Sequence, residues 1–253
     1  MPTIVALTNG SPHSWIIIHA VVDRFGPITI LTEERESRAK LIHRRMKRQG
    51  LVAVLGQVGF LLLQRLLARR DRTRLAEIVA SLDLHPALDG RCEILPVGSV
   101  NSLACREALA RLEPDVVIVY GTAVLRKETL QAIKAPLLNL HSGITPAYRG
   151  QAGGYWAMAQ SDPGRAGVTV HLVDAGVDTG GVIRQAPFTP TERDTFATYP
   201  YLQASVFRLL AVQAIEEALA GALKPFHPEG PSRQFYLPTL WGYLWTGLSK
   251  RVW

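Results

Sequence analysis

Residues 137–183 decide the fold, and they read LLNLHSGITPAYRGQAGGYWAMAQSDPGRAGVTVHLVDAGVDTGGVI. The stretch opens with a short apolar run that is typical of a buried strand, and this run carries Asn139 and His141 at its end. It closes with DAGVDTGG, a glycine-rich acidic turn that contains Asp178 and lies between two strand-like runs. An amide, an imidazole and a carboxylate are therefore expected at strand ends.

Asn139 and His141 are two residues apart, so a strand points both side chains to the same side. At a sheet edge, the neutral donor of Asn139 and the proton-carrying donor of His141 would point to the same position. Two such donors are what an oxyanion site requires. We expect Asp178 to pair with His141, to raise its pKa and to favour its charged form. The carboxylate could also accept a proton, directly or through water. This chemistry requires neither a metal nor a covalent nucleophile.

Two other polar residues of the stretch invite interpretation. Arg149 either contacts an anionic group of a substrate or holds its own loop by bonding backbone carbonyls. His171 alternates with apolar residues on the strand before the acidic turn, and we interpret it as structural rather than catalytic.

Three motifs carry a family resemblance: NLH, the sequence SGITPAYRG that follows it, and GVTVHLVDAGVDTG. They resemble the folate-dependent formyltransferases, a family that includes glycinamide ribonucleotide, methionyl-tRNA and sugar-amine N-formyltransferases. The similarity is dense from Pro114 to Gln185, weak before Arg91 and lost after about Gly221. It implies a Rossmann-like formyltransferase fold.

The resemblance also implies the site. Asn139, His141 and Asp178 fall on the family's catalytic positions, although the family most often has Pro-Ser or Gly-Ser after this histidine, where this chain has Ser142-Gly143. The implied formyl donor is 10-formyltetrahydrofolate, whose pterin ring is expected to lie between two segments of the chain. These cofactor-binding segments comprise Gly121, Thr122, Ala123, Val124, Leu125 and Arg126, and Asp174, Ala175, Gly176 and Val177.

Strand-like and helix-like segments alternate along the chain, which favours an α/β fold with a mostly parallel, twisted sheet and flanking helices. The loop after the first strand, residues 8–11, lacks G-x-G-x-x-G, so a dinucleotide cofactor is not expected. That loop either holds an anion at a helix start or is an ordinary strand–helix turn. We expect strands at 3–7, 28–31, 93–96, 115–120, 137–140, 168–173 and 182–187. We expect helices at 11–23, 33–49, 102–112, 154–160 and 195–222, and one or two further helices at 51–80.

The length of 253 residues and the hydrophobic content of 47% suit one domain with a full core. We expect a formyltransferase catalytic domain at 1–225 and an aromatic, basic C-terminal tail at 226–253. The two cysteines give neither a disulfide framework nor a metal cluster, and the first residues do not read as a signal peptide, so a cytoplasmic location is expected. The longest apolar run, Leu51–Leu63, has 13 residues and is too short to span a bilayer.

The net charge of +7 permits an anionic partner. Basic residues gather from Arg35 to Arg74, around the apolar run. This segment is either a solvated helix face whose apolar side packs on the body or an amphipathic surface that meets lipid or a partner. The aromatic tail either packs on the body, forms a homodimer contact or lies on a membrane surface. Nucleic acid is not expected as a partner.

Together these features predict an enzyme that transfers a formyl group from 10-formyltetrahydrofolate to a small-molecule amine, with no metal. The nearest alternative is a hydrolase that deformylates the folate with the same three residues; in such relatives an N-terminal regulatory domain is usual, and none is seen here. A non-catalytic folate- or ligand-binding module on the same fold is the other alternative, and the intact Asn139, His141 and Asp178 disfavour it. The acceptor stays open among an amino sugar, an amino-acid-like metabolite and a lipid-linked amine.

Overall fold

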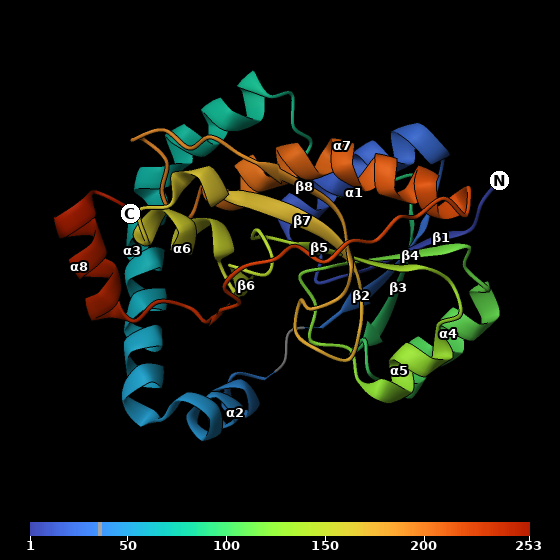
Figure 1. Cartoon of the computed structure of the whole chain (residues 1–253), viewed down its shortest axis with the longest axis horizontal. Coiled ribbons are helices and arrows are strands. Elements are labelled where there is room, and N and C mark those ends of the chain that lie inside the picture. The colour runs from blue at the N-terminus through green and yellow to red at the C-terminus, as the bar shows by residue number, and fades with distance from the viewer. Residues whose placement is uncertain (35–36) are drawn as a thin grey trace.

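In a computed structural model, which describes residues 1–34 and 37–253, the chain folds around a seven-stranded sheet. Helices cover both faces of this sheet (Figure 1). The strands are β1 (Ile4–Thr8), β2 (Thr29–Glu33), β3 (Glu93–Gly98), β4 (Val116–Tyr120), β5 (Leu137–His141), β7 (Gly167–Leu172) and β8 (Val182–Pro187), with a separate pair formed by β6 (Arg149–Gly150) and β9 (Gln234–Phe235). The helices are α1 (Pro12–Phe25), α2 (Arg38–Gln49), α3 (Leu51–Ser81), α4 (Leu103–Leu112), α5 (Lys127–Ala132), α6 (Gly153–Ala159), α7 (Tyr199–Leu219) and α8 (Leu240–Lys250), with a 3₁₀ turn at Pro163–Arg165.

The strand order is β3-β2-β1-β4-β5-β7-β8. The first five strands of this order pair in parallel, and β7 runs antiparallel to both of its neighbours. The predicted α/β fold with a mostly parallel sheet is therefore confirmed. The chain builds outward from β1 to β3 and then returns to the other side of β1 for β4. In open α/β sheets, ligands bind outside the carboxyl ends of the strands near such a switch point.

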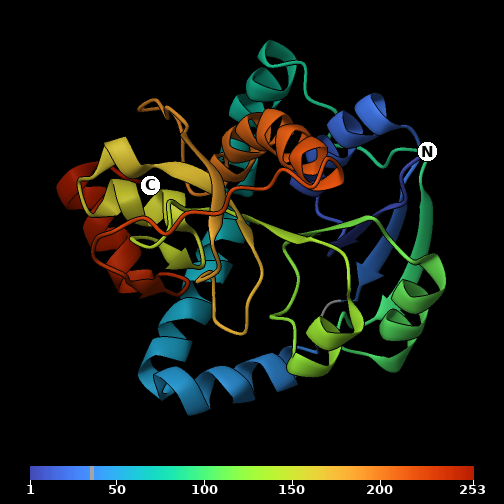
Figure 2. The same cartoon turned by 45° about the vertical axis from the view of Figure 1, so that its right-hand side comes forward.

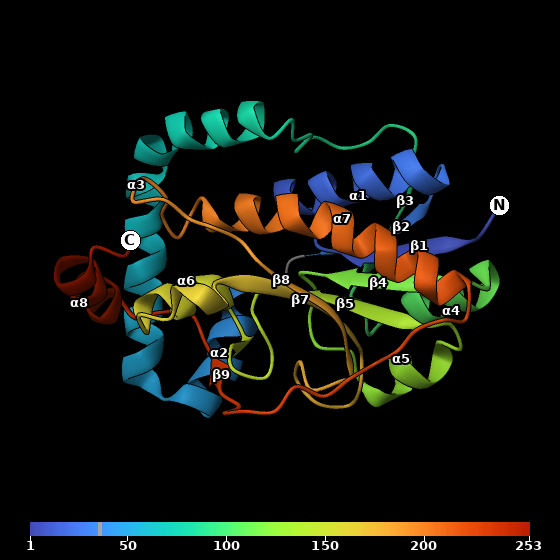
Figure 3. The same cartoon turned by 45° about the horizontal axis from the view of Figure 1, so that its top comes forward.

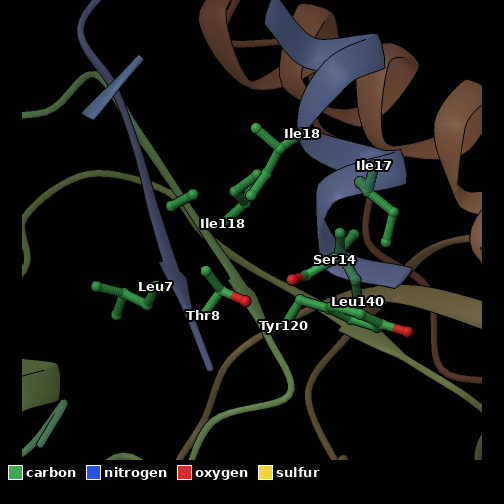
Figure 4. A pocket seen from close by; sticks show the side chains of 9 residues that line it. Leu7, Thr8, Ser14, Ile17, Ile18, Ile118, Tyr120 and Leu140 are labelled. Atoms are coloured by element: carbon green, nitrogen blue, oxygen red, sulfur yellow. The ribbon is translucent and has the colours of Figure 1, made fainter. Parts of the chain in front are cut away.

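Two apolar layers hold the helices on the sheet. All five residues of β4, VVIVY, are buried because both faces of the strand are covered. One layer packs α1 and α7 against the sheet, and these two helices lie side by side in Figure 3. The other layer packs α4 and α5 against the opposite face. Between α1 and the sheet a cavity of about 10 Å³ remains, beside Ser14, Ile118 and Tyr120 (Figure 4). Such a void holds about one water molecule at most, so it is a gap in the packing rather than a substrate site.

The predicted tail is folded. Phe226 forms an isolated bridge with Val182, β9 pairs in parallel with β6, and α8 packs against α3. Tyr243 of α8 is fully buried, and its ring lies 5.0 Å from that of Phe60 on α3. The tail therefore packs on the body of its own chain, which is the first of the three possibilities that the sequence left open.

The predicted helix at 33–49 is wrong at its beginning, because Glu33 is the last residue of β2 and α2 begins at Arg38. The Glu33 carboxylate accepts hydrogen bonds from the Val100 and Ala123 backbone N–H groups, which ties the end of β2 to the loops after β3 and β4. Arg35, with which the predicted basic segment opens, lies outside the described residues.

The segment predicted as one or two helices at 51–80 is the single helix α3. Within residues 1–34 and 37–253, α3 is the one helix long and apolar enough to cross a membrane by length and composition, and 22% of its most apolar window is buried. The expectation that this run is too short to span is wrong by that measure, because the apolar character continues beyond Gln64 and Arg65 to Leu66 and Leu67.

Candidate active site

Strand β5 places the first two predicted residues. Asn139 lies opposite Val119 of the parallel neighbour β4 and opposite His171 of the antiparallel neighbour β7. His141 is the last residue of β5 and is buried, with 5% of its side chain exposed. Because strand side chains alternate, Asn139 and His141 share one side of the sheet, and both reach Asp178.

Asp178 lies on the loop between β7 and β8 and is held by three groups. Asn139 Nδ2 donates to Asp178 Oδ1 at 3.2 Å, and the Gly150 N–H donates to Oδ2 at 2.8 Å. His141 Nδ1 lies 3.4 Å from the same Oδ2. The backbone of Asp178 is left-handed, with φ of 53°, a conformation that residues other than glycine seldom adopt and that clusters at functional sites. The structure thus brings the three predicted catalytic residues together.

The hydrogen bonds define which ring nitrogens carry protons. His141 Nε2 lies 2.8 Å from the Tyr148 carbonyl oxygen, which can only accept, so Nε2 donates. The second nitrogen, Nδ1, therefore faces Asp178 as the position for a further proton. His171 Nδ1 donates in the same way to the Leu172 carbonyl at 2.7 Å. Its Nε2 is then free to accept from Asn139 Nδ2, which is 2.9 Å away.

Burial and the neighbouring charges determine the protonation states of His141 and Asp178. Burial lowers the pKa of His141, and the neighbouring Asp178 carboxylate, which acts to raise that pKa, does not offset it. Burial acts to raise the pKa of Asp178, but His141, His171 and the Gly150 N–H together lower it to about 2. At neutral pH the carboxylate is charged and the His141 ring is neutral. The expectation of a histidine charged at rest is therefore wrong, because the cost of burying a charged ring outweighs the attraction of Asp178.

A two-stranded brace holds the Asp178 loop. Gly150, whose N–H bonds Asp178, belongs to β6 and pairs with Phe235 of β9. Arg149 donates to the Val177 carbonyl at 2.7 Å and to Ser232 Oγ at 2.9 Å. The structure agrees with the second interpretation of Arg149, in which it holds a loop by bonding a backbone carbonyl. The loop that it holds is the acidic loop that contains Val177, not the loop on which Arg149 itself lies. Gly150 has φ of 89° and lies against the backbone of Phe235, so a side chain there would meet the tail.

The first predicted folate segment follows β4, beside the end of β5. Asn101 holds it by donating to the Val124 carbonyl at 3.0 Å and accepting from the Arg126 N–H at 2.7 Å. Val124 is 58% exposed, whereas Leu125 is buried in the core. Of these two residues, Val124 is thus the one placed to contact a ring, and Leu125 is a core residue. The segment's other members are Gly121, whose φ is 71°, Thr122, whose hydroxyl donates to the next carbonyl, and Ala123, whose N–H donates to Glu33.

The second predicted folate segment leads from β7 to Asp178, on the other side of β5. Asp174 Oδ1 accepts from the Gly176 N–H at 3.0 Å and from Thr179 Oγ1 at 2.7 Å, which closes the turn around Ala175. The two segments leave strands that pair with β5 on opposite sides. The first continues past the end of β5, whereas the second begins beside Leu137 at the start of β5, because β7 runs antiparallel, and its loop returns to Asn139 and His141 at Asp178. A groove of about 480 Å³ lies near Leu137 and Val173, at the start of β5 where the second segment begins, and its lining includes none of the three predicted catalytic residues.

His171 was interpreted from the sequence as a structural residue, but it lies in contact with the three predicted catalytic residues. Its Nε2 contacts Asn139 and lies 3.6 Å from Asp178 Oδ1. The signal that could have found it is the antiparallel register of β5 and β7, which sets His171 opposite Asn139. In the described part of the chain, no group of three or more His, Cys, Asp or Glu side chains could hold a metal ion.

Comparison with known proteins assigns the class. A model of the formyl transferase family matches residues 64–202, and the chain therefore belongs to the formyl transferase family. A methionyl-tRNA formyltransferase of Synechococcus sp. (strain JA-2-3B'a(2-13)) is 38% identical over 140 residues, which are 54% of this chain and 42% of that protein. The chain thus spans less than half the length of the curated relatives it matches.

Solved structures share the fold. A sugar N-formyltransferase from Shewanella sp. FDAARGOS_354 aligns with a TM-score of 0.57 and 12% identity, over 93% of this chain and 76% of that one. An N-formyltransferase from Helicobacter canadensis, crystallised with folinic acid and dTDP-3-aminofucose, aligns with a TM-score of 0.56 and 15% identity, over 93% of this chain and 71% of that one. At these identities the likeness concerns the fold.

Proposed function

We propose that the chain transfers a formyl group from 10-formyltetrahydrofolate to the amine of a small molecule. The observation that carries this proposal is the meeting of Asn139, His141 and Asp178 at the end of β5. An amide donor, an imidazole and a carboxylate are there in contact, at an edge of the sheet where α/β proteins bind ligands. Membership of the formyl transferase family supports the same reaction.

Formyl transfer to an amine needs two kinds of group. The amine nitrogen forms a bond to the formyl carbon, the formyl oxygen becomes an oxyanion, and the bond to the folate nitrogen then breaks. A donor must stabilise the oxyanion, and one such donor contributes about 3 kcal/mol in comparable sites. An acceptor must take the proton that the amine loses, and the folate nitrogen must receive one when it leaves. Asn139 supplies the first function, and the His141–Asp178 pair supplies the second.

His141 suits the role of proton acceptor because it is neutral at rest. Its Nε2–H is held by the Tyr148 carbonyl, so an incoming proton can add only at Nδ1. Nδ1 faces the Asp178 carboxylate, so the imidazolium formed by proton transfer gains a partner as soon as it forms. The same proton can then pass to the leaving folate nitrogen. The His141 ring thus carries a charge only while the reaction needs it.

Asn139 has to change partners during this reaction. At rest its two amide hydrogens point at Asp178 Oδ1 and His171 Nε2. To donate to the oxyanion, the amide gives up one of these bonds, and the bond to Asp178 is the longer. His171 keeps the amide oriented meanwhile, because its own tautomer is fixed by the Leu172 carbonyl. We therefore assign His171 the role of a positioning residue.

The two segments that flank β5 are proposed to hold the folate. Both are fixed by side chains before any ligand arrives, Asn101 on one side and Asp174 on the other, which lowers the entropy lost on binding. The neighbour from Helicobacter canadensis was crystallised with a folate derivative and an amino-sugar nucleotide, which supports a folate donor and a small amine acceptor.

An amine panel tests the proposal. The purified chain is incubated with 10-formyltetrahydrofolate and amino-sugar nucleotides, amino acids or amino lipids, and N-formyl products are detected by mass spectrometry. We expect one class of amine to be formylated, with release of tetrahydrofolate in equal amount. Folate release at an undiminished rate without any amine would instead indicate the hydrolase. Failure of calorimetry to detect binding of a formyl-folate analogue would overturn the proposal, whichever amines were tried.

A further inference from the structure

Two helices at one end of the molecule present apolar side chains to solvent. Along α3 the exposed apolar residues recur every three or four positions and so form one stripe. In α8 the exposure reaches 72% for Trp245 and 77% for Leu248. Together they form what we name the α3–α8 face: Leu51, Val52, Leu55, Val58, Leu61, Leu62 and Leu66 of α3, and Trp241, Leu244, Trp245 and Leu248 of α8.

These residues lie on two helices that pack against each other. Figures 1 and 2 show α3 and α8 side by side at one end of the molecule, with α4 and α5 at the other. The two helices meet through glycines of α3, where Gly56 lies against Trp241 and Gly59 against Leu240. Soluble monomers seldom expose an apolar patch of this extent, so the face is expected to have an occupant.

The body of the protein fixes how α3 can meet that occupant. Val54, Gln57 and Phe60 are buried on the inner side of the helix, and Gln57 donates to the Leu237 carbonyl beneath it. One side of α3 is thus committed to the protein, although the helix is long and apolar enough to cross a bilayer. Such a helix fits a surface on which it lies flat, with its free side turned outward.

The charge around the face identifies the occupant. Residues 37–70 contain nine lysines and arginines and no aspartate or glutamate, so this segment alone carries +9 against +7 for the whole chain, and the rest carries −2. Residues 230–253 also contain no acid and add Arg233, Lys250 and Arg251. Exposed cations on α2 and α3 lie next to the apolar stripe in the sequence: Lys47, Arg48, Arg65, Arg69 and Arg70. An apolar stripe flanked in the sequence by basic residues complements anionic headgroups above acyl chains.

We propose that the α3–α8 face binds the surface of an anionic lipid membrane. The exposed leucines and valines of α3 that belong to this face, with Leu248 of α8, enter the boundary between headgroups and acyl chains. Trp241 and Trp245 lie at headgroup level, the depth that tryptophan prefers in membranes. Arg65, Arg69 and Arg70 of α3 contact lipid phosphates.

The face is close to the site described above. Trp241 follows Phe235 by six residues, and Phe235 pairs with Gly150, whose N–H bonds Asp178. A chain of that length spans at most about 22 Å, so the Asp178 carboxylate lies within about 30 Å of the membrane-binding helix. If the proposed function holds, on which this consequence rests, an amine carried on a lipid is within reach of the site, and the lipid-linked amine becomes the favoured acceptor class.

Flotation with vesicles tests the binding without folate or amine, so its result does not depend on the proposed function. The full chain is mixed with phosphatidylcholine vesicles that contain phosphatidylglycerol, and with vesicles of phosphatidylcholine alone. We expect it to float with the anionic vesicles and to be released as salt screens the charges. Each of R65Q and R69Q should lower the partition coefficient about fivefold, the effect of one basic residue near an anionic surface. W245S should lower it about tenfold or more.

Matched controls come from α4, at the far end of the molecule. Leu103 is 62% exposed there and Arg111 is exposed, so L103S and R111Q change the same chemistry away from the face and should leave the partition unchanged. Circular dichroism confirms that each variant is folded. The proposal is overturned if the folded chain stays unbound to both vesicle types. It is also overturned if sedimentation shows a dimer that W245S dissociates while vesicle binding is absent, since a second copy then covers the face.

Discussion

Replacing Asp178 by asparagine changes one atom at the centre of the site. Asparagine tolerates the left-handed backbone that residue 178 adopts, so the loop keeps its course. The carboxylate accepts from two donors, Asn139 Nδ2 on one oxygen and the Gly150 N–H on the other. The amide of D178N has one oxygen and one NH₂, so whichever way it turns, its NH₂ faces one of these donors.

The contacts of Asp178 give the expected loss of stability and the expected loss of rate in D178N. Contacts lower the pKa of Asp178 from 3.8 to about 2, which corresponds to at most about 2 kcal/mol of stabilisation of the folded state at neutral pH, because the part supplied by a charged His141 is absent there. The variant loses this term, and a buried donor left unpaired costs a similar amount, about 1 to 3 kcal/mol. The rate should fall on the order of a thousandfold, because the imidazolium at His141 loses its counter-charge and the proton its acceptor.

The assay pairs initial rates on the identified amine with urea unfolding. Asp194 supplies a matched control, because its carboxylate is also buried and bonded, by Arg74 and Thr191, outside the site. D194N should lose stability to a similar degree and keep its rate once the folded fraction is taken into account. A folded D178N enzyme that turns over within a few-fold of the wild type would refute the assignment of Asp178.

Three further outcomes are expected. N139A should lose about a hundredfold in rate, the usual effect of removing one oxyanion donor, with little change in the binding of a formyl-folate analogue measured by calorimetry. Because burial lowers the pKa of His141, the rate should stay level as pH falls through 6.5 and decline only below it; a decline centred above 6.5 in the pH–rate profile would contradict a neutral resting histidine. The same group is protonated more readily in the unfolded chain, so its contribution to stability is lost as pH falls below 6.5. G56A places a methyl group 2.5 Å from Trp241 and should destabilise the fold by about 1 to 3 kcal/mol in thermal unfolding, whereas G90A, with nothing within 4 Å, should be nearly neutral.

The sequence predicted correctly those features that depend only on residues close together in the chain. The apolar run of β4 gave its strand, and the two-residue spacing of Asn139 and His141 gave their shared side, because strand alternation is a property of the backbone. Ser102 was recognised as a helix start, and its hydroxyl does accept from the Cys105 N–H.

What the sequence did not predict depends on contacts between distant segments. Glu33 reads as a helix former, yet its bonds to Val100 and Ala123 keep it in β2. His171 comes to Asn139 through a register that no short window contains. The pKa of His141 follows from how much of the ring the fold buries, and the sequence shows only the partner, Asp178. The aromatic tail was recognised by composition, while α8 within it was not predicted.

The pairing of β6 with β9 has a consequence for the order in which the protein becomes competent during synthesis. All seven strands of the main sheet precede residue 188, whereas the residues that pair with Arg149 and Gly150 are 234 and 235. Because a chain leaves the ribosome from its N-terminus, the sheet can assemble while β6 still lacks its partner. The brace on the Asp178 loop can then form only after residues 234 and 235 have left the ribosome. A nascent chain should therefore form the main sheet before the loop of the candidate site is held in place.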